Sequence, residues 1–153
     1  HGDNSAVNAH YSGTMGVCYE GAMAGFPSIA YSLDNHSSEA DFTPLRPYLV
    51  DITLKVLKEG LPAFSCLNVN FPNLSAFKGV KVCRMGISRW VKETHKCFHP
   101  TTNQPYLWLV GYRENLEPEA TDTDIWALEN GYVAVTPVTL DVTNYKLLES
   151  LSF

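Results

Sequence analysis

The sequence has no excess of basic residues, no long apolar run and no closely spaced pair of cysteines. Its 11 lysine and arginine residues are outnumbered by 16 acidic residues, which gives a formal net charge of −5. A surface that binds nucleic acid is normally basic, so this balance argues against a nucleic-acid partner. No apolar segment approaches the roughly 18 residues that a transmembrane helix needs, so no membrane partner is expected. The first residues also lack the basic and apolar regions of a secretory signal peptide.

The four cysteines, at positions 18, 66, 83 and 97, include no Cys-x-x-Cys pair. Cys18, Cys66 and Cys83 fall in apolar helix or strand patterns, where a cysteine usually behaves as a small buried hydrophobe. This pattern favours free thiols in a reducing compartment, so we expect a cytoplasmic protein. Two disulfides remain the alternative.

The composition is that of one globular domain, with 45% hydrophobic and 18% charged residues in 153 positions. There are no internal repeats and no low-complexity tracts. The sequence begins His1-Gly2-Asp3-Asn4, without an initiator methionine and inside a polar loop. We therefore expect a fragment or a processed product of a longer protein.

A polar loop that leads into an apolar helix is the most informative stretch. Asn4 lies in the loop, and Ser12, Gly13 and Thr14 stand where the helix begins. Ser12 or Thr14 can cap the helix, because a short side-chain oxygen accepts from free backbone N–H groups. Gly13 leaves space for a ligand, because it has no Cβ. Free N–H groups and the helix dipole attract anions, so the stretch predicts a phosphate site, although such residues are more often plain caps.

Hydrophobic periodicity predicts alternating helices and strands, which indicates an α/β protein. The expected elements are a helix after Ser12, a turn at Gly25, a strand over 28–32, a helix over 43–58 that Thr43 caps and Gly60 ends, strands over 64–72, 80–84, 90–98, 106–112 and 132–137, a polar loop over 113–121, and helices over 123–130 and 141–151. Asn68 and Asn70 share one side of their strand, and structural hydrogen bonding is their favoured use over lining a cleft.

A glycine-bearing loop at the edge of a sheet is where α/β proteins bind ligands.

The segment from 90 to 112 has the pattern of a β-hairpin. Trp90, Tyr106, Trp108 and Tyr112 would place much aromatic area on a protruding ribbon. An isolated two-stranded hairpin is barely stable alone, so we expect this one to pack on another subunit.

Four residues of metal-ligand type alternate along the first strand of this hairpin, namely Glu93, His95, Cys97 and His99. Tetrahedral coordination needs converging ligands, which one flat strand does not provide. A solvated strand face is therefore favoured over a metal site.

Ser12 is rejected as a catalytic nucleophile. In the Gly-x-Ser-x-Gly elbow, His10 stands where the first glycine belongs and Thr14 where the second belongs. His10 lies too close in the same loop to serve Ser12 as a base. No carboxylate cluster with metal-ligand spacing lies near Ser12, and Asp3 is the only acid nearby.

A series of short motifs, in order and at compatible spacings, spans nearly the whole sequence. They are Gly2-Asp-Asn4, Tyr11-Ser-Gly-Thr14, Glu20-Gly21, Gly25-Phe-Pro-Ser-Ile-Ala30 with Ser32, Leu67-Asn-Val-Asn-Phe-Pro72, Gly79 to Gly86 with Arg84, Thr123-Asp124 with Ala127, Gly131-Tyr-Val-Ala-Val-Thr-Pro137, and Asp141-Val-Thr143. Together they resemble the SurE family of survival proteins, which are metal-dependent nucleotidases. The resemblance is to the larger, carboxy-terminal part of a family member.

This resemblance implies an α/β fold with a three-layer Rossmann-like sheet, here lacking its amino-terminal strands. It implies a single domain over 1–153, with its core at about 1–86 and 121–140. A protruding β-hairpin at about 87–113 and a terminal arm with a helix at about 141–153 would serve dimer or tetramer assembly, as in the family.

The implied activity is that of a 5′/3′-nucleotidase, which hydrolyses the phosphomonoester of a nucleoside monophosphate with a divalent cation, Mg²⁺ or Mn²⁺. In the family, two Asp residues, a Ser and the Asn of a Ser-Gly-x-Asn run hold the cation. These lie ahead of residue 1, so this chain carries no metal ligand and we expect it to be inactive alone. The phosphate-contacting positions match Asn4, Ser12, Gly13 and Thr14, and supporting positions match Gly2, Tyr11, Thr123 and Asp124.

Tyr145 departs from the family pattern, because related sequences often carry His there, and this leaves the role of that position open. The alternative function is a non-catalytic oligomerisation or anion-binding domain.

Overall fold

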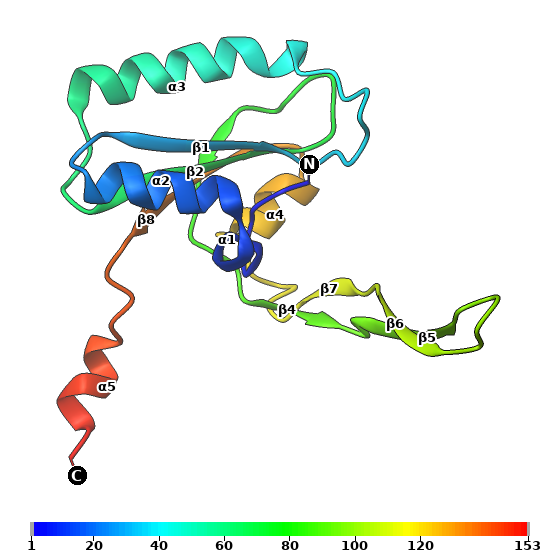
Figure 1. Ribbon diagram of the computed structural model, residues 1–153. Helices are drawn as coiled ribbons and strands as arrows, with labels where there is room; N and C mark the ends of the chain where they lie inside the picture. Colours follow the sequence, from blue (N-terminus) through cyan, green and yellow to red (C-terminus); the bar gives the residue numbers. More distant parts are fainter. Residues whose placement is uncertain (1, 153) are drawn as a thin grey trace.

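A four-stranded sheet, in the order β1-β2-β8-β3, forms the centre of the computed structural model, which describes residues 2–152 (Figure 1). β1 (Ser28–Leu33) runs parallel to β2 (Ser65–Phe71), and β3 (Val80–Val82) runs parallel to β8 (Val133–Thr139). β2 and β8 are antiparallel, so the two parallel pairs meet in the middle of the sheet.

Helices cover both faces of this sheet and confirm the predicted α/β class with three layers. α2 (Gly13–Met23) packs on one face and α3 (Arg46–Glu59) on the other, and α4 (Asp124–Glu129) packs against β8. The short α1 (Asn8–Tyr11) precedes α2, and α5 (Tyr145–Ser150) lies away from the sheet (Figure 1). Because successive strand residues face opposite sides, Cys66 of β2 packs with α2, whereas Val69 and Phe71 pack beneath α3.

Local signals place α2 and β1 as predicted. The Ser12 hydroxyl accepts the N–H of Met15 at 3.1 Å, so it caps α2. Gly25 has a φ of 85° in the turn before β1, a backbone conformation that a residue with a Cβ rarely adopts.

The predicted cap at Thr43 is wrong. Residues Thr43–Leu45 form a 3₁₀ turn ahead of α3, and the Thr43 N–H donates to the Asp41 carboxylate at 2.8 Å. Phe42 precedes this turn and Leu45 precedes α3, and neither start has a side-chain cap, while Gly60 ends α3 with a φ of 73° as expected.

The ribbon that protrudes from the sheet in Figure 1 consists of two separate strand pairs. The single strand predicted over 90–98 is divided into β4 (Ser88–Val91) and β5 (Thr94–Phe98), with Lys92 between them at a φ of 53°. β5 pairs with β6 (Pro105–Leu109), and β4 pairs with β7 (Tyr112–Asn115). The polar loop predicted from residue 113 is therefore wrong over its first three positions, which continue the ribbon.

The predicted closing helix over 141–151 is shorter, and its acidic start is wrong. α5 begins at Tyr145, where the Asn144 side chain accepts the N–H of Leu147 at 3.0 Å. The Asp141 carboxylate accepts from the Thr143 N–H at 2.9 Å and from the Tyr145 hydroxyl. Such local side-chain bonds compete with helix formation, which explains why residues 141–143 stay outside α5.

All four cysteines are free, and Cys18, Cys66 and Cys83 are buried as predicted. Burial raises the pKa of the Cys66 thiol to about 11, so this group stays protonated at neutral pH. Over residues 2–152, no helix has the length and apolar character needed to cross a bilayer.

Candidate anion site

One cavity of about 420 Å³ gathers six of the eight residues that the sequence assigned to the site. These are Gly2, Asn4, Tyr11, Ser12, Gly13 and Thr14. The opposite wall comes from the end of β1 and the loop that follows it, including Ser32 and Asn35. The cavity therefore lies at the carboxyl end of a strand, between the polar loop and the start of α2.

The start of α2 supplies the hydrogen-bond donors of this cavity. The first N–H groups of a helix have no acceptor inside it, and the Ser12 hydroxyl takes the N–H of Met15. Gly13 and Thr14 are exposed at the cavity. A Cβ placed on Gly13 would meet no atom within 4 Å, so it would project into open space in front of the helix. This geometry suits an anion.

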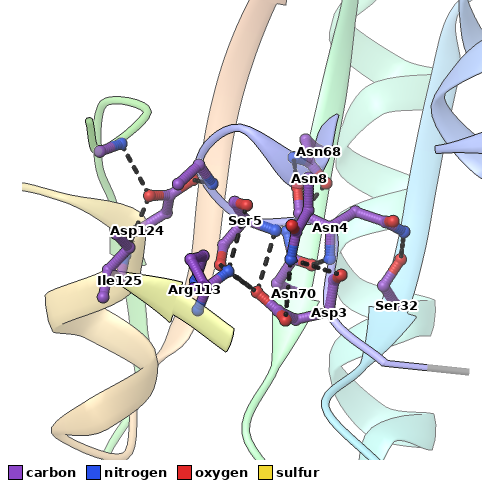
Figure 2. A network of polar contacts seen from close by, with 12 residues as sticks. Asp3, Asn4, Ser5, Asn8, Ser32, Asn68, Asn70, Arg113, Asp124 and Ile125 are labelled. Carbon is purple, nitrogen blue, oxygen red and sulfur yellow. Dashed lines mark hydrogen bonds and ion pairs between the residues drawn. The ribbon is translucent and has the colours of Figure 1, made fainter. Parts of the chain in front are cut away.

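Hydrogen bonds from the central strand β2 fix the backbone of the loop at Asn4 (Figure 2). The Asn4 N–H donates to the Asn70 side chain at 2.7 Å, and the Asn4 carbonyl accepts from Asn68 at 2.8 Å. Asn70 also donates to Asn68 at 2.8 Å, which confirms the structural use predicted for these two residues. The Asn4 side chain donates to Ser32, so it already has one partner on β1.

Asp124 holds the next part of the loop from behind. Its carboxylate accepts the N–H groups of Ala6 at 2.8 Å, Gly86 at 2.8 Å and Ile125 at 2.9 Å. Ala6 is fully buried with a φ of 49°, a strained conformation for alanine that the surrounding bonds must maintain. Burial raises the pKa of the Asp124 carboxyl, and the three N–H donors offset part of this rise.

An ion pair that the sequence did not predict holds Asp3 and Ser5. Arg113 Nη1 lies 2.7 Å from the Asp3 carboxylate and 2.8 Å from the Ser5 hydroxyl. The two charged side chains are only 21% and 11% exposed. Residues 3 and 113 are far apart in sequence, and no local pattern connects them. The sequence pattern predicted a polar loop at Arg113, so it did not indicate that Arg113 lies on a strand.

A second cavity, of about 760 Å³, adjoins the first and shares Gly2, Asn4, Tyr11 and Ser12 with it. Its other walls come from His36 and from the ribbon, including Trp90 and Arg113. The Trp90 indole N–H donates to Asn8 at 3.0 Å. The two cavities therefore lie side by side, and Tyr11 and Trp90 place aromatic side chains at the larger one.

Residues 1–92 match the protein-family model described as survival protein SurE. The chain belongs to the SurE family. It is 52% identical over 151 residues to a 5′-nucleotidase SurE of Phocaeicola vulgatus and 50% identical over 152 residues to one of Bacteroides thetaiotaomicron. Each alignment covers 99% of this chain and 58% of the relative, so the chain spans less than two thirds of the length of these proteins.

A solved SurE protein from Aquifex aeolicus has the same fold, with a TM-score of 0.79 and 39% sequence identity. The match covers 98% of this chain and 60% of that chain. It supports the α/β architecture predicted from the resemblance.

Within this SurE chain, Thr123 and Asp124 lie behind the loop and line neither cavity. The Thr123 hydroxyl accepts the N–H of Trp126 at 3.2 Å and caps α4, which presents Asp124 to the loop. Asp124 anchors the backbone at Ala6, and the supporting role of these two residues at the site stays a prediction.

His10 and Ser12 line different cavities. His10 lies at an apolar cavity of about 550 Å³ beside β8, whereas the Ser12 hydroxyl is occupied as the cap of α2. This arrangement agrees with the rejection of Ser12 as a nucleophile served by His10.

The residues from 2 to 152 do not fit a divalent metal site. Among them, no group of three or more His, Cys, Asp or Glu side chains converges. Glu93, His95 and His99 are exposed and Cys97 is partly exposed, as on a solvated strand face.

Proposed function

We propose that this chain forms the phosphate-binding wall of a SurE-type 5′-nucleotidase, which hydrolyses the phosphomonoester of a nucleoside monophosphate. The observation that carries the proposal is the cavity at the start of α2 that Asn4, Ser12, Gly13 and Thr14 line together. Relatives at 50% identity or more carry the name 5′-nucleotidase SurE, which supports the same activity here.

The chemistry of these residues suits a phosphate dianion. Backbone N–H groups at the start of α2 and the hydroxyl of Thr14 would donate to the phosphoryl oxygens, and the helix dipole would add to their attraction. Hydrogen bonds to a charged acceptor are roughly twice as strong as neutral ones. This wall would hold and orient the phosphoryl group.

The whole protein, on this proposal, also uses a divalent cation, Mg²⁺ or Mn²⁺. Its ligands would lie in the portion of the relatives that this chain does not span. The 153-residue chain alone is then expected to bind phosphate without hydrolysing a nucleotide.

The larger cavity beside the anion site has the character of a nucleoside pocket. Both cavities fall within the range of about 300–1,000 Å³ that is usual for small-molecule sites. Tyr11 and Trp90 line the larger one, and aromatic faces stack on bases of any sequence. A nucleoside monophosphate would place its base there while its phosphate contacts α2.

Assembly into a homo-oligomer completes the proposal. On the outer ribbon, Leu107, Trp108 and Leu109 are 68%, 60% and 80% exposed, and no residue of α5 is buried. Apolar surface of this kind suits a second copy of the chain. The buried free thiols support a cytoplasmic location.

Phosphate binding by the chain tests this function directly. Calorimetric titration with inorganic phosphate should show saturable binding, and Thr14→Ala should weaken it about tenfold or more, because a hydrogen bond to a charged group contributes about 1.5–3 kcal/mol. Ser12→Ala should also weaken it, because it removes the cap that orders the first N–H groups of α2. Asn144→Ala is the matched control, since it removes the cap of α5 far from the cavity.

Unchanged phosphate affinity in both variants, together with an altered oligomer mass, would favour the alternative of an assembly domain. Hydrolysis of AMP with Mg²⁺ by the 153-residue chain alone would contradict the proposed division between phosphate wall and metal site.

A further inference from the structure

One cross-strand pair at the root of the ribbon holds both ends of the short loop segment from Asp3 to Asn8. Trp90 of β4 and Arg113 of β7 are directly opposite in the antiparallel register. Arg113 bonds to Asp3 and Ser5, and Trp90 bonds to Asn8. The ribbon therefore contacts the loop through two neighbouring side chains of one rigid unit.

Asp3 is the centre of this arrangement. Its carboxylate accepts the Ser5 N–H at 3.1 Å and faces Asn8 Nδ2 at 3.4 Å, besides its ion pair. All contacts from Arg113 arise from a single nitrogen, Nη1, which also lies 3.3 Å from the Ser5 carbonyl. Because both partners are largely buried, removal of either would leave an uncompensated charge beside the loop.

The charge of Asp3 matters for an anion. Asp3 lines the larger cavity, which shares four residues with the anion cavity. A bare carboxylate at this place would repel an incoming phosphate dianion, and such repulsion is stronger where protein limits the access of water. Arg113 neutralises that carboxylate while it fixes the loop.

We propose that Arg113 is a positioning residue of the anion site: it holds residues 3–5 of the loop and cancels the charge of Asp3, so that phosphate can bind at the start of α2. This inference rests on the proposed function. Trp90 holds the other end of the segment through its bond to Asn8, and we call each of these two contacts of the ribbon with the loop a clamp.

Two arginine variants on the same strand pair test the proposal. Arg113→Met removes the clamp, and Arg89→Met is the matched control, because Arg89 pairs with Glu114 at 2.7 Å on the exposed surface and bonds to no residue of the loop. Arg113→Met should weaken inorganic phosphate binding by at least about tenfold, because it leaves the Asp3 charge unpaired beside the cavity. It should also speed amide hydrogen exchange at Ser5, and Arg89→Met should do neither.

Arg113→Lys should restore most of the affinity, because one nitrogen makes all the contacts. Asp3→Asn in the Arg113→Met background should also recover affinity, because it removes the carboxylate charge that Arg113 no longer neutralises. Failure of both rescues would mean that Arg113 contacts the anion itself, which would overturn a positioning role.

The exchange measurement separates this proposal from the proposed function. If the unaltered chain binds no phosphate, the proposed function fails, whereas the exchange rates still report on the clamp. Equal exchange at Ser5 in Arg113→Met and in the unaltered chain would overturn the clamp whatever the phosphate titration shows. Should Arg113→Met fail to fold, the single variant Asp3→Asn weakens the same ion pair from the other side, and it should speed exchange at Ser5.

Discussion

The carboxylate of Asp124 offers the sharpest test of how the loop is held. It is fully buried and accepts three backbone N–H groups, with Oδ2 serving Ala6 and Oδ1 serving Gly86 and Ile125. Asp124→Asn keeps one oxygen, which can still serve Gly86 and Ile125. The amide nitrogen then faces the Ala6 N–H, so this substitution removes only the loop anchor.

The expected cost follows from the number of donors left without an acceptor. A buried donor that loses its acceptor costs about 1–3 kcal/mol, so Asp124→Asn should lower the free energy of unfolding by about that amount. Because the amide is uncharged, Asp124→Asn also removes the cost of burying a charge. The loss in free energy of unfolding should therefore lie toward the lower end of that range. Asp124→Ala strips all three donors and should cost about 3 kcal/mol or more.

Urea unfolding of the three proteins measures these costs, and amide hydrogen exchange at Ala6 locates them. Exchange at Ala6 should be faster in Asp124→Asn, while Gly86 and Ile125 stay protected. A stability for Asp124→Asn equal to that of Asp124→Ala, or an Ala6 amide that keeps its protection, would refute the assignment of the Oδ2 bond as the anchor.

The titration of Asp124 also makes the free energy of unfolding depend on pH in a definite direction. Burial raises the pKa of Asp124 above its ordinary value of 3.8, so the folded chain binds this proton more tightly than the unfolded chain. The stability contributed by this group is therefore full below 3.8 and is lost as pH rises through the raised pKa. The free energy of unfolding of Asp124→Asn does not depend on this titration. The difference in stability between the unaltered chain and Asp124→Asn should therefore become smaller as pH rises through the raised pKa.

Three further outcomes follow from the same structure. Gly13→Ala and Gly16→Ala both place a Cβ in open space on α2, so each should leave stability unchanged or raise it by up to about 1 kcal/mol, but only Gly13→Ala should weaken phosphate binding in a titration. Bonds from Arg84 hold the pKa of Glu117 and of Asp122 below their ordinary values of 4.5 and 3.8, and the Ile87 N–H adds to the lowering at Glu117. The stability that these carboxylates contribute is present above those values and is lost as pH falls through the lowered pKa values. Arg84→Met should therefore reduce that part of an acid-unfolding curve. Trp108→Ser, on the exposed outer ribbon, should reduce the mass of any oligomer in light scattering without lowering the melting temperature, and an unchanged mass would exclude this face from assembly.

Local chemistry explains which elements could be predicted. The cap at Ser12, the turn at Gly25 and the alternation along β2 each depend on residues within a few positions of one another, and the structure confirms all three. The errors at Thr43 and at the start of α5 arose where an aspartate side chain bonds to nearby backbone, which competes with the simpler pattern.

The prediction of the ribbon was only partly correct for a different reason. Aromatic and β-branched residues indicated strands over 90–112, but no propensity marks the break at Lys92. The continuation of β7 to Asn115 depends on its pairing with β4, which is a contact between separate parts of the chain.

By itself, the sequence determined the fold class, the cap of α2 and the polar residues at its start, because helix caps, turns and periodic apolar faces depend on neighbours along the chain. Only the tertiary structure decided how the loop at the anion site is held. Asn4 meets Asn70 across 66 positions, Asp3 meets Arg113 across 110, and Ala6 meets Asp124 across 118. Such partners come together only when sheet register and layer packing are set, so no local propensity could have named them.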